Sequence, residues 1–86
     1  MAKKEKLLLK ILQAKQDYNI NFKELCSLLK SMGFKERIKG SHHIFSRENI
    51  IEIVNIQPKK KLSKPYQVKQ IRNLIIKYKI GDINND

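Results

Sequence analysis

The chain has 86 residues, with 19 Lys and Arg against eight Asp and Glu, and a formal net charge of +11 at pH 7. This length holds one domain with a small core and excludes multidomain and cofactor-binding α/β enzymes. Such an excess of positive charge attracts a nucleic acid, an anionic membrane or an acidic protein. With 41% hydrophobic residues, the composition is not that of a disordered chain.

The single cysteine, Cys26, cannot form a disulfide within the chain, which argues against a disulfide-stapled secreted domain. No apolar run approaches the roughly 20 residues of a membrane span. The leucines at 7–9 follow basic residues as in a signal peptide, but Lys10 interrupts the run and no small-residue cleavage site follows. We therefore expect a cytoplasmic protein with no membrane partner.

Two helices are predicted before residue 34. Residues 3–16 are good helix formers with apolar side chains at helical spacing. Asn21 can cap a second helix, and Glu24 follows three residues later as in a capping box. Gly33 suits the position after that helix, where the left-handed conformation costs least.

The hydrophobic period then changes from 3.6 to 2, which predicts strands over 34–39 and 42–46 around a type II′ turn at Gly40-Ser41. Residues 50–56 are β-branched and predict a third strand. A basic open loop is expected over 57–64, followed by a helix that begins at Pro65 and ends at Gly81. The predicted class is α+β, with an α-β-β-β-α order, a three-stranded antiparallel sheet, helices packed on one face and an extra N-terminal helix.

The two-residue turn determines which side chains share a face of the hairpin. It places Lys39 opposite His42 and Ile38 opposite His43. Because strand side chains alternate, His42 then lies on the open face with three cations. These are Lys35, Arg37 and Lys39. The core face carries Phe34, Ile38 and Phe45, together with Glu36 and His43.

A histidine beside cations has the chemistry needed to cleave RNA. Imidazole exchanges protons near neutral pH, and RNA supplies its own nucleophile in the 2′-OH next to the phosphate. One general acid or base contributes ~10²–10⁴-fold, and cations stabilise the reacting phosphate. We therefore predict that His42 is catalytic. No residue spacing indicates a metal site, and no cofactor is expected.

A second observation concerns the stretch from Ile53 to Ile80, which contains basic residues and no acid. This favours phosphate contacts by its loop lysines. The predicted RNA-binding residues are Lys35, Arg37, Lys39, Ser41, Lys59, Lys60, Lys61 and Lys64. Two further interpretations stay open. His43 is expected to be structural at the sheet edge, and Glu52 is either a solvated residue or one that orients the imidazole of His42.

The segment GFKERIKGSHHIF at 33–45 resembles the HicA family of bacterial toxins, also called YcfA-like. The flanking NFKELCSLLKSMGF and PYQVKQIRNLI resemble that family's helices, so the resemblance covers 21–80. It implies a fold like the double-stranded-RNA-binding domain, metal-independent mRNA cleavage, and neutralisation by a HicB antitoxin that covers the active site. The family's catalytic histidine follows the Gly-Ser turn, which is His42 here. The Pro-x-His of many members is absent after the third strand, where residues 55–58 read NIQP.

These observations predict a helical extension over 1–20, a HicA-like RNase domain over 21–80 and a polar tail over 81–86. The leading hypothesis is a bacterial, cytoplasmic toxin that cleaves mRNA. A non-catalytic RNA-binding module of the same fold is the alternative, because fold alone does not distinguish the two. A purely protein-binding role is a third possibility, and steep salt dependence of RNA binding would argue against it.

Overall fold

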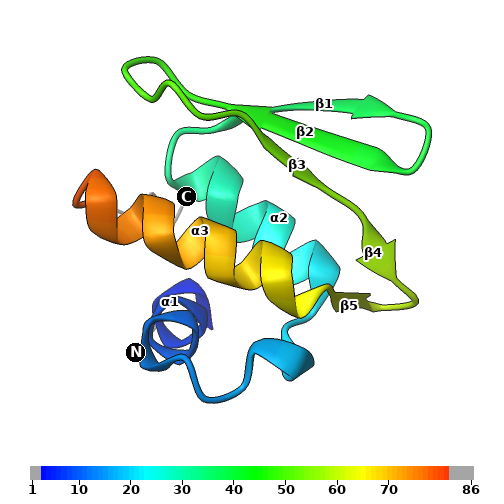
Figure 1. The fold of residues 1–86 in the computed structure, drawn as a ribbon, viewed down its shortest axis with the longest axis vertical. Helices are drawn as coiled ribbons and strands as arrows, with labels where there is room; N and C mark the ends of the chain where they lie inside the picture. The colour runs from blue at the N-terminus through cyan, green and yellow to red at the C-terminus, as the bar shows by residue number, and fades with distance from the viewer. Residues whose placement is uncertain (1–2, 82–86) are drawn as a thin grey trace.

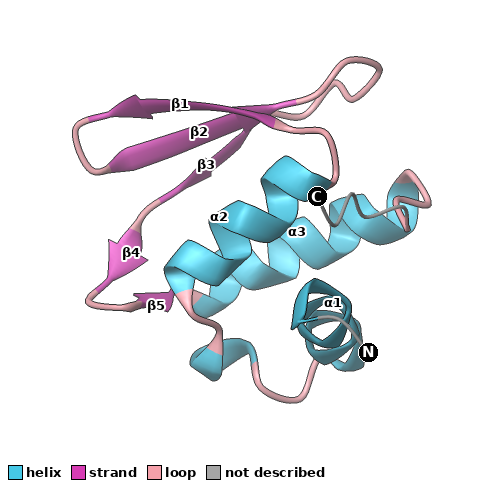
Figure 2. Ribbon diagram, turned by 180° about the vertical axis from the view of Figure 1, so that it is seen from behind, coloured by secondary structure: helices cyan, strands magenta, loops and turns pink. Residues whose placement is uncertain are grey.

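The computed structural model describes residues 3–81. The three-stranded antiparallel sheet lies on one side of α2 (Phe22–Ser31) and α3 (Pro65–Lys77), and α1 (Lys3–Gln13) packs against these helices on their other side (Figures 1 and 2). This confirms the predicted α+β fold with its extra N-terminal helix. Apart from Gly81, the predicted polar tail lies outside the described residues. The elements in chain order are α1 (Lys3–Gln13), the 3₁₀ turn η1 (Asp17–Asn19), α2 (Phe22–Ser31), β1 (Lys35–Lys39), β2 (His42–Ser46), β3 (Val54–Ile56), β4 (Pro58–Lys59), β5 (Leu62–Ser63) and α3 (Pro65–Lys77).

Both ends of α2 follow the predicted signals. The Asn21 side chain accepts a hydrogen bond from the backbone N–H of Glu24 at 2.9 Å, as an N-cap does. At the other end, Gly33 has a φ of 93°, and the N–H of Phe34 donates to the Leu29 carbonyl at 3.1 Å. This Schellman arrangement satisfies the last carbonyls of α2 and directs the chain into β1.

The helix α3 begins at Pro65 as predicted but ends at Lys77, before the predicted stop at Gly81. Lys79 takes the left-handed conformation, with a φ of 52°, and the N–H of Ile80 donates to the Ile75 carbonyl at 3.0 Å. A lysine thus occupies the position that glycine fills after α2. The prediction that Gly81 ends this helix is therefore wrong.

The hairpin of β1 and β2 has the predicted register, with Lys39 opposite His42 and Ile38 opposite His43. Gly40 has a φ of 62°, whereas Ser41 is not among the described residues with positive φ, which agrees with a type II′ turn. The strand β3 adds to the other edge of β2, where Ile44 lies opposite Asn55.

The third strand is shorter than predicted, because it spans Val54–Ile56 rather than 50–56. The chain turns directly after β2, and the N–H of Ile50 donates to the Arg47 carbonyl at 3.1 Å. The pairing with β2 therefore begins at Val54, opposite Phe45. Ile51, which the prediction placed in the strand, is 90% exposed.

Residues 57–64 form a second small hairpin instead of the predicted open loop. Strands β4 and β5 pair antiparallel across a turn in which Lys60 has a φ of 59°. The N–H of Phe22 donates to the Lys61 carbonyl at 2.9 Å, which fixes this hairpin to the start of α2. The basic segment is therefore joined to the rest of the fold by backbone hydrogen bonds.

The core lies between the sheet and the helices, and α1 extends it. The sheet contributes Phe45, Val54 and Ile56, which are all fully buried. Ile11 of α1 is also fully buried, and Leu7 and Leu8 pack against the same core. Within residues 3–81 no helix is both long enough and apolar enough to cross a membrane.

Candidate functional site

His42 is exposed on the open face of the sheet, and both nitrogens of its ring have amide partners. Its Nδ1 lies 3.0 Å from Oδ1 of Asn55 on β3, and its Nε2 lies 3.2 Å from Nε2 of Gln57. Asn55 shares this face because its cross-strand partner, Ile44, has the same parity as His42. The imidazole is therefore held in one orientation although it is exposed to solvent.

Neighbouring groups determine which ring nitrogen carries the proton. Lys64 can only donate, and it donates to Oε1 of Gln57 at 3.2 Å, so the Gln57 amide nitrogen faces the other way. That nitrogen donates to the Ser41 hydroxyl at 3.1 Å and to Nε2 of His42. On the other side, Oδ1 of Asn55 can only accept, so Nδ1 carries the hydrogen. In the neutral imidazole, these contacts place the hydrogen on Nδ1 and leave Nε2 as a hydrogen-bond acceptor.

The predicted cations of β1 share the face of His42. Lys39 lies directly opposite His42, and Arg37 and Lys35 follow at alternate positions along β1. All three side chains are exposed, and none forms an ion pair with another residue of the described chain. These three cations are therefore available to an anionic ligand that approaches the open face.

The loop lysines separate into two groups. Lys64 joins the His42 network through Gln57. Lys60 and Lys61 instead line a pocket of about 640 Å³, which His43 lines as well. Lys59 is exposed on β4. The predicted set of RNA-binding residues therefore does not form one continuous surface around His42.

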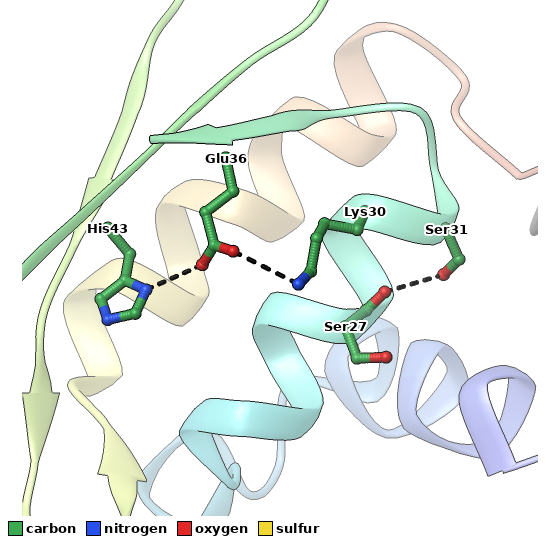
Figure 3. A network of polar contacts seen from close by, with 5 residues as sticks. All are labelled: Ser27, Lys30, Ser31, Glu36 and His43. Carbon is green, nitrogen blue, oxygen red and sulfur yellow. Dashed lines mark hydrogen bonds and ion pairs between the residues drawn. The ribbon is translucent and has the colours of Figure 1, made fainter. Parts of the chain in front are cut away.

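His43 points to the helix side of the sheet and has different partners. Its Nδ1 lies 2.8 Å from Oε2 of Glu36, and Oε1 of Glu36 lies 3.3 Å from the Lys30 ammonium (Figure 3). The His43 ring also meets the Phe22 ring edge-on, with 4.9 Å between the ring centres. The hydrogen bond from His43 lowers the pKa of Glu36, and Lys30 adds to this effect. Glu36 is therefore an ionised acceptor. His43 is partly buried as predicted, but it lies on the central strand of the sheet and not at its edge.

Cys26, Glu36 and His43 place possible metal-ligand atoms within 4.8 Å of one another, although their spacing in the sequence indicates no metal site. Burial is the main cause that raises the pKa of the Cys26 thiol to about 11, and the charge of Glu36 adds to it. Four lysines also line the pocket beside these residues. The positive surroundings oppose a dication, and they favour an anionic ligand at this pocket.

Two acidic residues, Asp17 and Glu52, bind side chains at or beside α3. Arg72 donates to both carboxylate oxygens of Asp17, at 2.8 and 3.0 Å. Glu52 accepts hydrogen bonds from Lys77 and from the Tyr78 hydroxyl, which lower the pKa of its carboxyl to about 2. Glu52 therefore binds the end of α3 and does not orient the imidazole of His42.

The two residues that position His42 were missed by the sequence reasoning. Asn55 and Gln57 lie at the sites where the predicted third strand and the predicted loop meet. Strand alternation could have identified Asn55, because a residue opposite Ile44 lies on the same face of the sheet as His42. Recognising it requires the pairing of β2 with β3, which the overlong predicted strand obscured.

A comparison with protein-family models matches residues 22–78 to the HicA toxin of bacterial toxin–antitoxin systems. The match includes the hairpin, His42 and the residues that surround it, and it leaves α1 outside. Searches of curated proteins and of solved structures found no match.

Proposed function

Because the chain belongs to the HicA toxin family of bacterial toxin–antitoxin systems, we propose that it cleaves mRNA without a metal ion and uses His42 as its general acid or base. One observation carries this proposal. The imidazole is exposed on a cationic face, and hydrogen bonds at both nitrogens fix its orientation and tautomer. General acid–base catalysis requires this combination of access and positioning.

The geometry supports attack by the 2′-OH of the RNA itself. The 2′-OH replaces the neutral amide of Gln57 at Nε2 of His42, and this nitrogen takes the hydroxyl proton. The bond from O2′ to the adjacent phosphorus forms, the bond from phosphorus to O5′ breaks, and O5′ takes a proton from water. The products are a 2′,3′-cyclic phosphate and a 5′-hydroxyl end, and His42 later releases its proton.

Cations beside the imidazole support the charge that develops on the phosphate. Lys39 is the cross-strand neighbour of His42, and Lys64 reaches the same network through Gln57. The Ser41 hydroxyl lies beside Gln57 and can donate to a phosphate oxygen once the RNA is bound. Arg37 and Lys35 extend the positive face along β1, where they hold the phosphates that follow.

The proposed cellular partner is an acidic, HicB-type antitoxin that covers the open face. A net charge of +11 and three cations of β1 that form no ion pair within residues 3–81 favour an acidic surface as their complement. A protein bound over this face excludes RNA from His42. The proposed location of both proteins is the bacterial cytoplasm, where the mRNA is.

The proposal is tested by incubating RNA with the purified chain in excess EDTA and following cleavage by gel electrophoresis. We expect His42→Ala to reduce the rate by about 10²–10⁴-fold while RNA binding is retained. Asn73→Ala, on an exposed position of α3, is the matched control and should cleave at the wild-type rate. An RNA with a single 2′-deoxy nucleotide at the cleaved position should resist cleavage there.

Two outcomes would contradict this proposal. Equal cleavage by the wild type and His42→Ala would place the chemistry on another group or on a contaminant. Tight, salt-sensitive RNA binding without cleavage by the wild type would show a binding module of the same fold.

A further inference from the structure

A pocket of about 640 Å³ lies on the helix side of the sheet, on the opposite face from His42. Apolar groups of Phe22, Ile38 and Pro58 line it, and Glu36 and His43 line it as well. Lysines complete the lining, with Lys23 and Lys30 from α2 and Lys60 and Lys61 from the second hairpin. Its lining is therefore largely apolar and also contains one ionised carboxylate and four cations.

Three features of this pocket have no role in the chemistry at His42. Ile38 is 59% exposed, although it lies on the core face of β1. Glu36 is largely buried, with a side chain 15% exposed, yet it lines the pocket. Lys60 and Lys61 belong to the second hairpin, and the Lys61 carbonyl accepts a hydrogen bond from the N–H of Phe22 at the start of α2. Both lysines line this pocket instead of the open face.

We propose that this pocket binds one nucleotide of the RNA, with guanine as the preferred base. The apolar side chains contact the faces of the base, Glu36 binds its Watson–Crick edge, and the lysines bind its phosphate. Single-stranded RNA is commonly recognised in this way, by contacts to the faces of unstacked bases and hydrogen bonds to their edges. The inference rests on the proposed function, since it assigns a specificity site to the same ribonuclease.

The preference for guanine follows from the chemistry of the carboxylate. Guanine presents two adjacent donors on its Watson–Crick edge, the N1–H and the 2-amino group, and a carboxylate can accept from both. Adenine, cytosine and uracil each present only one donor at that edge. Among residues 3–81, each oxygen of Glu36 has one partner, His43 or Lys30, which leaves a further lone pair for the base.

The position of the pocket allows one RNA strand to reach both sites. His42 and His43 are consecutive on β2, so their side chains lie on opposite faces of the sheet at the same end of the hairpin. An RNA strand that passes this end places its reacting phosphate on the open face and a neighbouring nucleotide in the pocket. Lys60 and Lys61, in the turn between β4 and β5, line the pocket in which the neighbouring nucleotide would lie.

The test measures binding of 5′-GMP, AMP, CMP and UMP to the full chain in excess EDTA, by NMR titration of the Ile38 and His43 signals. We expect GMP to bind about tenfold more tightly than the other three, and Glu36→Gln to remove this preference. Glu48→Gln is the matched control, because it makes the same chemical change on an exposed turn away from the pocket. Ile38→Ala, at an exposed position that tolerates truncation, should weaken binding of all four nucleotides.

Several results would overturn the pocket. Equal affinities for GMP and UMP would do so, and so would equal losses of GMP affinity in Glu36→Gln and Glu48→Gln. Chemical-shift changes centred on Asn55 instead of Ile38 would also overturn it, as would GMP binding that requires added zinc. Wild-type cleavage of RNA without nucleotide-dependent shifts at Ile38 and His43 would overturn the pocket and leave the ribonuclease intact. GMP binding at the pocket by a chain that does not cleave RNA would support the pocket and contradict the ribonuclease.

Discussion

His42 and His43 are neighbours on β2, but the two faces of the sheet give them different surroundings. His42 is exposed and contacts the neutral amides of Asn55 and Gln57. His43 is largely buried, with a side chain 22% exposed, and contacts the Glu36 carboxylate and the Phe22 ring. Amide partners orient a ring without adding a charge, whereas a carboxylate and a close aromatic contact stabilise the fold around it. Position relative to the sheet therefore separates the proposed catalytic histidine from a structural one.

Among the tests of this difference between the two histidines, the largest expected effect is on the RNA cleavage rate when Asn55, the partner of His42 at Nδ1, is replaced. Asn55→Ala removes the acceptor that sets the tautomer, and we expect the RNA cleavage rate to fall about ten- to a hundredfold, as for residues that orient catalytic or metal-bound histidines. Asn55→Asp should restore part of the rate and move the pH–rate profile to higher pH, because a carboxylate favours the charged imidazole. Rate measurements across pH test both variants. An unchanged profile in Asn55→Asp would show that Asn55 does not act through His42.

A second prediction compares the two histidines by their effect on stability. His43→Ala removes a packed ring and one partner of the Glu36 carboxylate, so we expect it to lower the free energy of unfolding by about 1–3 kcal/mol. His42→Ala changes an exposed side chain and should stay within about 0.5 kcal/mol of the wild type. Urea unfolding of both variants under the same conditions measures the difference. Equal losses would mean that both histidines are structural.

The smallest expected effect is the loss of stability at low pH that comes from the pairing of Glu36 with His43. The hydrogen bond from His43 lowers the pKa of Glu36 in the folded state. Its stabilising contribution is therefore complete above the usual carboxyl pKa of about 4.3, and it is lost as the pH falls through the lowered value. Glu36→Gln should be less stable than the wild type at about pH 6, and this difference should shrink toward about pH 3. Urea midpoints at both values test this, and a difference that stays constant would contradict it.

The register of β1 and β2 could be predicted to the residue because a two-residue turn determines every cross-strand pair, although β1 begins at Lys35 and not at Phe34 as predicted. The start of β3 could not, because Ile51 and Ile53 have high β propensity and yet are not paired with β2. The second hairpin was missed for a related reason. Its turn uses a lysine at positive φ, Lys60, where no glycine or asparagine marks it.

The candidate site could be predicted only in part for the same reasons. Parity alone placed His42 on the open face with Lys39, and the structure has that register. The roles of Asn55 and Gln57 depend on where β3 pairs, and the separation of Lys60 and Lys61 from Lys64 depends on the second hairpin. Tertiary pairing decides these contacts, and local sequence patterns do not contain it.

Arg72 connects the segment that matches the HicA family to residues that precede this segment in the chain. Its guanidinium, on α3, binds Asp17 through two hydrogen bonds and also donates to the Ile11 carbonyl at 3.1 Å. Asp17 and Ile11 both precede the matched residues 22–78. A chain that began at residue 22 would keep the whole matched segment, yet its Arg72 would lose the carboxylate that neutralises it. The segment of family similarity in this protein is therefore smaller than the unit that packs together in the structure.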